Sequence, residues 1–164
     1  MTSDTDHTTR RHALQLAAGV AAVAALSKEA AAAPNVAGVW KLVGGSMTDP
    51  GGKSVGVPYG PRGMGLVSLA SDGRMMAVLI DGRAKLPDGA KREYSSYCGN
   101  YTFDGSTLIT TVDASSDSAR LASQQVRKVR FEGERMILVP PERDDGGVKI
   151  HRELIWERIS TVSL

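Results

Sequence analysis

The chain has 164 residues, of which 41% are hydrophobic and 5% aromatic, and its formal net charge is +2. This length and composition are typical of a single globular domain once the first part of the chain is set aside. Charges of both signs are interspersed, which argues against a nucleic-acid-binding protein, because such a protein concentrates basic residues on one face. The one dense basic stretch, residues 127–130, falls in a predicted strand, where its charges would be divided between two faces.

Residues 1–33 have the layout of an export signal. Polar residues lead to Arg10-Arg11, an apolar run of mostly alanine, valine and leucine follows over residues 14–26, and the segment ends in alanines. Thr9-Arg10-Arg11 resembles a twin-arginine signal. The apolar run is too short to anchor the protein in a bilayer of roughly 30 Å. We therefore expect cleavage after Ala32, a periplasmic or secreted protein, and no stable membrane anchor after processing. An alanine-rich helix that stays attached is the alternative.

The rest of the chain is a series of strand-like runs. In the first, Val36–Met47, Trp40 and Leu42 lie on one side with Lys41 between them, as expected for a strand that carries a tryptophan into a core. Further strands are predicted at residues 55–59, 63–70, 74–80, 94–103, 107–114, 125–132, 135–139 and 148–159.

The segments between these runs are rich in glycine, proline and aspartate, which favour turns. Residues 115–123 leave room for one helical turn, and residues 142–147 read as a charged loop. The loop at residues 81–92 is the longest break before residue 94, and an entrance or lid usually lies in such a loop.

Nine strand-like runs without a helix of ten residues predict an all-β sandwich or barrel. The last run, residues 148–159, would span roughly 40 Å at about 3.3 Å per residue, so it must coil strongly in a small domain. Coiling favours closure into a barrel, which also removes exposed sheet edges. We therefore expect one antiparallel barrel over residues 36–159.

Few residues suited to metal or nucleophilic chemistry fall in this domain. His151 is its single histidine, whereas zinc and iron sites commonly use two or three imidazoles, so we expect no metal and no cofactor. A haem bound through His151 alone is the alternative. Cys98 is the only cysteine, which excludes an internal disulfide, and we interpret it as a structural thiol rather than a nucleophile. No glycine-rich loop lies between a predicted strand and a predicted helix of the domain, which disfavours a nucleotide site.

Aromatic residues are the next candidates. Tyr97, Gly99, Tyr101 and Phe103 share one face of the run 94–103. If that face points into a barrel, Gly99 leaves space beside an aromatic wall, as a pocket for an apolar molecule requires. Tyrosine hydroxyls can bind a polar group of a ligand or, beside a base, protonate an enolate. The alternatives are that the opposite face looks inward, or that the tyrosines are ordinary core and rim residues.

Arg127 shares a strand face with Val129 and Phe131. If Phe131 points into the barrel, Arg127 does so too, and a buried guanidinium requires an anionic partner such as a ligand carboxylate or Glu153. In the other register Lys128 and Arg130 would take that place.

Several short motifs, in this order and spacing, resemble the bacterial and fungal lipocalin-like domain family. They are Gly38-Val39-Trp40, Pro58-Tyr59-Gly60, Ser71–Met75, Tyr97–Tyr101 and Trp156-Glu157-Arg158. The resemblance implies an up-and-down antiparallel barrel of about eight to ten strands with an internal cavity. It also implies that Trp40 closes one end and that Arg158 packs over its ring as a cation. Gly38 lets another part of the chain approach closely at that end.

The expected function is therefore to bind a small hydrophobic or amphipathic molecule inside the barrel, as a monomer or homodimer. The ligand would contact Tyr59, Tyr97, Gly99, Tyr101, Phe103, Arg127 and Phe131. The alternative is a cofactor-free isomerase or cyclase acting on a hydrophobic substrate in the same cavity. A third interpretation is a stress or interaction protein whose cavity is incidental.

Overall fold

The computed structural model describes residues 35–161, so the predicted export signal lies outside the described residues. Strands alternate between buried and exposed residues, as in β4, where Met75, Ala77 and Leu79 are buried and their neighbours are not. The elements are β1 (Gly38–Thr48), β2 (Ser54–Gly56), β3 (Gly63–Leu69), β4 (Arg74–Asp81), β5 (Tyr94–Phe103), β6 (Thr107–Ser115), the short 3₁₀ turn η1 (Ser118–Arg120), β7 (Gln124–Glu132), β8 (Arg135–Val139), β9 (Arg143–Asp145) and β10 (Val148–Ser160).

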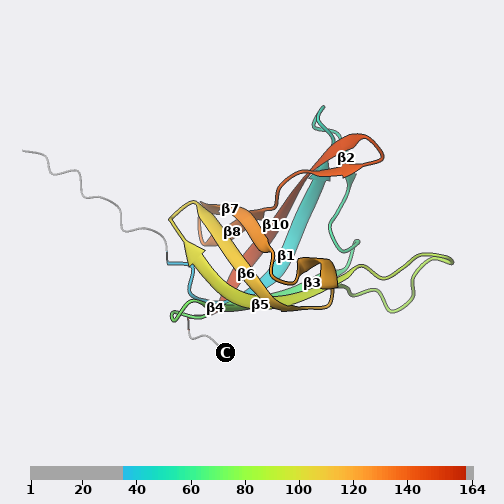
Figure 1. Ribbon diagram of the computed structural model, residues 1–164. Coiled ribbons are helices and arrows are strands. Elements are labelled where there is room, and N and C mark those ends of the chain that lie inside the picture. The colour runs from blue at the N-terminus through green and yellow to red at the C-terminus, as the bar shows by residue number, and fades with distance from the viewer. Residues whose placement is uncertain (1–34, 162–164) are drawn as a thin grey trace, which may run out of the picture. The chain divides into compact units, whose positions relative to one another are not determined.

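Eight of these strands close into an antiparallel barrel (Figure 1). β1 pairs with β3 on one side and with β10 on the other, and the intervening strands follow one another in chain order. Closure leaves no unpaired edge in the ring. The two short strands β2 and β9 add to the ends of β1 and β10 outside the ring. The predicted all-β up-and-down barrel is confirmed.

Two local predictions were wrong. The strand expected at residues 55–59 is shortened to β2, which ends at Gly56 before the turn that contains Tyr59. The charged loop expected at residues 142–147 contains β9, which pairs with the start of β10. Gly146 and Gly147 both have positive φ, +62° and +89°, and two such residues make the tight turn that joins antiparallel neighbours.

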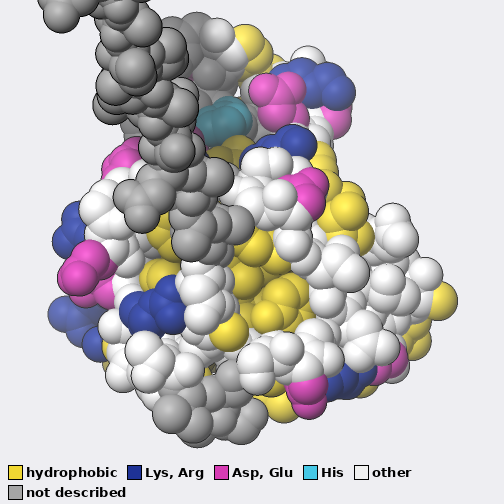
Figure 2. Space-filling view, turned by 90° about the vertical axis from the view of Figure 1, so that its left-hand side faces the viewer, with side chains coloured by type: hydrophobic (Ala, Val, Ile, Leu, Met, Phe, Trp, Pro, Cys, Tyr) yellow, Lys and Arg dark blue, Asp and Glu magenta, His cyan; other side chains and the backbone are white. Residues whose placement is uncertain are grey.

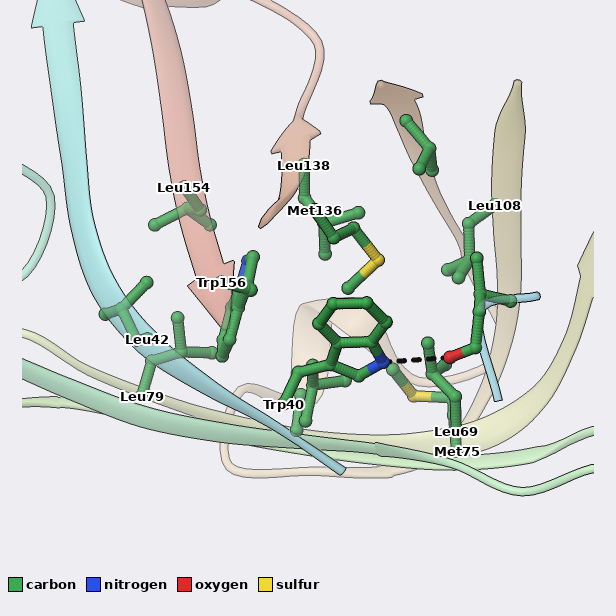
Figure 3. Close-up of a cluster of buried hydrophobic side chains, with 14 of the residues drawn as sticks. Trp40, Leu42, Leu69, Met75, Leu79, Leu108, Met136, Leu138, Leu154 and Trp156 are labelled. Carbon is green, nitrogen blue, oxygen red and sulfur yellow. Dashed lines mark hydrogen bonds between the residues drawn. The ribbon is translucent and has the colours of Figure 1, made fainter. Parts of the chain in front are cut away.

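The interior of the barrel is largely filled by side chains (Figure 3). Trp40 from β1 and Trp156 from β10 are each 1% exposed and enter the same core. The ring of Trp40 lies 6.2 Å from that of Phe131 between centroids, at an angle of 54°. Leu69, Leu108 and Met136 are also fully buried. The barrel is therefore a packed core around Trp40.

A set of polar contacts closes the Trp40 end. The guanidinium carbon of Arg158 lies 4.2 Å from the centroid of the Trp40 ring, as the family resemblance implied. Arg158 also donates hydrogen bonds to the backbone carbonyls of Asn35 and Ala37. The indole nitrogen of Trp40 donates to the carbonyl of Val36 at 2.9 Å. Residues 35–37 are thereby fastened across this end of the barrel.

Gly38 lies where β10 passes directly against β1. Its φ is +131°, and a Cβ placed on it would lie 2.4 Å from the carbonyl oxygen of Ser160. The pairing of β1 with β10 also shifts register between Val39 and Trp40 and again between Leu42 and Gly44. Such irregularities increase local twist, which helps a small sheet to close.

Candidate functional site

The interior side chains leave a cavity of about 60 Å³, here called the barrel cavity. That volume is room for about two water molecules. Its walls are mainly apolar side chains, namely Val67, Leu69, Met75, Ala77, Leu79, Leu108, Leu138, Pro140, Leu154 and Trp156. Its polar lining consists of two tyrosines and three arginines, namely Tyr59, Tyr97, Arg120, Arg127 and Arg152. The wall of the barrel cavity therefore combines apolar side chains with guanidinium and phenol groups.

Arg127 enters the cavity from β7. Val129 and Phe131 pack into the core on the same strand face, whereas Lys128 and Arg130 are exposed, so the alternative register with those two inside is wrong. The Arg127 guanidinium donates to the carbonyl of Val126 at 2.7 Å and to the side-chain oxygen of Gln125 at 3.3 Å. Both acceptors are neutral.

Of the two partners suggested for Arg127, a ligand carboxylate or Glu153, the second is wrong. The Glu153 carboxylate instead accepts from Arg130 at 3.0 and 3.2 Å and lies 3.2 Å from His151 Nε2. Among residues 35–161, no acidic side chain forms an ion pair with Arg127.

Arg152 reaches the cavity from β10. Its side chain is 16% exposed, and its guanidinium carbon lies 6.0 Å from the centroid of the Tyr59 ring. One terminal nitrogen donates to Glu93 at 3.1 Å. The Nε atom is buried and has no hydrogen-bond acceptor within the described part of the chain. Arg152 therefore has hydrogen-bonding capacity that its protein contacts leave unused.

Arg120 reaches the cavity from η1. Its guanidinium carbon lies 5.5 Å from the centroid of the Tyr97 ring, and Nη1 donates to the hydroxyl of Ser95 at 2.8 Å. The carboxylate of Asp117 lies 3.6 Å from its Nε and is 56% exposed. The acidic partner of Arg120 is thus a solvated side chain, whereas its contact with Tyr97 is at the cavity wall.

Tyr59 lines the cavity from the turn between β2 and β3, and the part of the cavity wall beside this turn is here called the mouth. It is 7% exposed and has φ of +60°, a conformation uncommon outside glycine. Its backbone N–H donates to Glu93 Oε2 at 2.7 Å, while the other oxygen of the same carboxylate accepts from Arg152. Burial raises the pKa of the Tyr59 phenol, so the group stays protonated and can donate a hydrogen bond at neutral pH.

The turn that carries Tyr59 lies over a fixed ion pair. Arg83 Nε donates to both carboxylate oxygens of Asp81, at 3.0 and 2.9 Å, and Asp81 is 2% exposed. A Cβ on Gly60 would lie 2.9 Å from that carboxylate. Arg92 donates to the backbone carbonyls of Asp81 and Arg83 and so fastens the loop predicted as an entrance.

Acid is expected to weaken this ion pair. The hydrogen bond from Arg83 holds the pKa of Asp81 below its usual value. A carboxyl with a lowered pKa stabilises the fold above its unfolded pKa of about 3.9, and that stabilisation is lost as pH falls through the folded pKa. Asp81→Asn should therefore be less stable than the parent at pH 7, and the difference should shrink below pH 4. Urea unfolding at pH 7, 4 and 3 measures this, with the exposed Asp88→Asn as control. A difference independent of pH would contradict it.

Not all of the predicted ligand residues line the cavity. Tyr59, Tyr97 and Arg127 do. Tyr101 is partly buried against the core, and its hydroxyl donates to the carbonyl of Ala70 at 2.9 Å. Phe103 and Phe131 also pack against the core without lining the cavity.

The gap expected beside Gly99 is wrong. A Cβ at that position would lie 1.9 Å from the carbonyl oxygen of Thr111, because the β5–β6 register shifts between Cys98 and Gly99. The glycine accommodates the neighbouring backbone rather than a ligand.

Cys98 and His151 do not line the cavity. The thiol of Cys98 donates to Asp113 at 3.4 Å, and burial together with this carboxylate raises its pKa, which disfavours the reactive thiolate. His151 is 40% exposed at its side chain. Within the described residues, no three His, Cys, Asp or Glu side chains are grouped so as to hold a metal ion.

The outer surface also carries apolar residues. Met64 and Leu66 on β3 and Met76 and Val78 on β4 are 39–58% exposed, because the opposite faces of these strands point into the core. They line a depression of about 790 Å³ on the outside of the barrel. Figure 2 shows hydrophobic side chains reaching the surface within a rim of polar and charged ones. Within residues 35–161, no helix has the length and apolar character needed to span a bilayer.

The closed barrel and its internal cavity define a lipocalin-like β-barrel. A model of the lipocalin-like domain matches residues 37–159, which is most of the chain and nearly all of the barrel. The chain therefore belongs to the lipocalin-like domain family, and the predicted family is confirmed. No curated protein matches the chain.

Proposed function

We propose that this protein binds a small hydrophobic or amphipathic molecule in the barrel cavity. The observation that carries the proposal is the composition of the cavity wall, where ten apolar side chains meet two tyrosines and three arginines. Apolar walls with a few convergent polar groups are what small-molecule sites require. The outer depression is the weaker candidate because, among the residues that the structure describes, Lys41 and Arg74 are the only charged groups in its lining.

The size of the cavity makes Tyr59 part of the proposal. Small-molecule sites usually have roughly 300–1,000 Å³, well above the volume of about 60 Å³ enclosed here. A ligand larger than a few atoms must therefore displace Tyr59, whose positive φ is a strained conformation. Release of that strain would offset part of the free energy needed to open the mouth.

Binding is better supported than the alternative of a cofactor-free isomerase or cyclase. Such an enzyme needs a base within hydrogen-bond reach of the substrate proton. The buried carboxylate nearest the mouth turn, Asp81, is held by two nitrogens of Arg83. The Tyr59 phenol is kept protonated by burial. These groups are suited to hold a ligand rather than to exchange protons with it.

If the signal predicted at residues 1–33 acts, binding takes place in the periplasm or outside the cell.

A one-residue change inside the cavity tests the proposal. Ala77→Val adds two carbon atoms to a wall residue that is 2% exposed, so it should fill the cavity and weaken binding of 1-octanol at least tenfold. Ala114→Val is the matched control, since Ala114 is an exposed strand residue outside the cavity. Binding is followed by NMR through the methyl groups of Leu138 and Leu154. A folded Ala77→Val protein that binds 1-octanol as well as the parent would place the site elsewhere.

A further inference from the structure

The inference concerns the chemical class of the ligand and rests on the proposed function. We propose that the ligand is an amphipathic carboxylate, with its apolar chain in the barrel cavity and its carboxylate bound by Arg127, Arg152 and Arg120. These arginines come from β7, β10 and η1, and all three line the same cavity.

Arg127 supplies the first argument. Its guanidinium is half-buried at an apolar cavity, and among residues 35–161 it donates only to two neutral oxygens, those of Val126 and Gln125. A charge removed from water needs a counter-charge, and within residues 35–161 no acidic side chain supplies one to Arg127. The planar guanidinium matches a carboxylate with two parallel hydrogen bonds. Arg127 therefore lacks the partner that a ligand carboxylate would provide.

The other two arginines add to the positive charge at the mouth. Their acidic partners, Glu93 for Arg152 and Asp117 for Arg120, are 43% and 56% exposed and so are screened by solvent. The Nε of Arg152 is buried without an acceptor among the described residues. Like charges held around one apolar cavity repel one another and raise the local concentration of anions. An anion at this position relieves the repulsion.

Glu93 links the binding of an anion to the opening of the mouth. One of its oxygens accepts from Arg152 and the other from the backbone N–H of Tyr59. A ligand carboxylate that takes over Arg152 competes with Glu93, and a displaced Glu93 no longer holds the Tyr59 turn. Binding of the carboxylate and entry of the apolar chain thus both require the Tyr59 turn to move. Replacing Glu93 by glutamine removes the competing charge and should favour the anionic ligand.

Octanoate and 1-octanol form the decisive pair, because they share a chain and differ in the anion. At pH 7.5 we expect the parent protein to bind octanoate at least tenfold more tightly than 1-octanol. Arg127→Met should lower this preference at least tenfold, because it should weaken octanoate binding far more than 1-octanol binding. Arg127→Lys should keep part of it, since the charge remains and the planar fork is lost. Arg130→Met is the matched control, because Arg130 lies on the same strand and is exposed. Glu93→Gln should increase the preference.

Equal binding of octanoate and 1-octanol by the parent would overturn the inference and leave the proposed function standing. Absence of binding for both would overturn the proposed function itself. If Arg127→Met and Arg127→Lys weaken the binding of octanoate and of 1-octanol by the same factor, Arg127 contributes to the shape of the cavity but does not bind the carboxylate. The inference is then wrong. Circular dichroism of each variant establishes that the barrel is intact before the comparison is made.

Discussion

Replacing Trp40 by alanine is expected to lower the free energy of unfolding by about 3–5 kcal/mol. The ring is 1% exposed, packs against Phe131 and lies beneath the guanidinium of Arg158, so its loss opens a void that the surrounding side chains cannot fill. The hydrogen bond from its nitrogen to Val36 is lost as well. Urea unfolding followed by circular dichroism measures the change.

Two further variants serve as a comparison and a control for Trp40→Ala. Arg158→Lys keeps the charge but loses the flat surface over Trp40 and the paired donors to Asn35 and Ala37, so it should cost less than Trp40→Ala. Met76→Ala truncates a side chain that is 58% exposed and should change stability by no more than about 0.5 kcal/mol. A Trp40→Ala protein as stable as the parent would show that the Trp40 end contributes little to stability.

Gly99→Ala is expected to destabilise the barrel by about 1–3 kcal/mol or more. The added Cβ would lie 1.9 Å from the carbonyl oxygen of Thr111, and a backbone atom in a paired strand cannot move aside without disturbing the β5–β6 ladder. The same substitution at Gly44 is the matched control, because a Cβ there meets only the side chain of Ile155, at 3.7 Å. Gly44→Ala should be neutral or slightly stabilising. Equal thermal unfolding temperatures for the two variants would contradict the close approach at Gly99.

Strands such as β4 and β5 were predictable because burial alternates with a period of two along them. The limits of β5 follow directly from such a pattern. β9 was missed because Arg143, Asp144 and Asp145 carry no apolar alternation, and their pairing is directed by the two glycines that follow. Local pattern thus predicts half-buried strands and fails for exposed ones.

The candidate site was less predictable than the strands. The alternation of residues shows which face of a strand a side chain lies on, but it does not show whether that part of the strand reaches the cavity. Tyr97 and Phe103 share a face, yet six residues at about 3.3 Å each place them roughly 20 Å apart, and only Tyr97 reaches the cavity. For β7 the sequence left two registers open, with Arg127 inward only if Phe131 is inward, and the structure packs Phe131 against the core. Arg120 and Arg152 carry no such signal, since only closure of the barrel brings them to the same mouth.

The pairing of β1 with β10 also has a consequence for how the barrel forms. Ala37 and Arg158, which meet at the Trp40 end, are 121 residues apart in the sequence. Contacts over such a separation require a large loop to close before they stabilise anything, which slows folding. During synthesis, β1 can pair with β3 early but must wait for its second neighbour until nearly the whole domain has left the ribosome. Until then β1 is an open sheet edge, and the nascent chain is most exposed to aggregation in that interval.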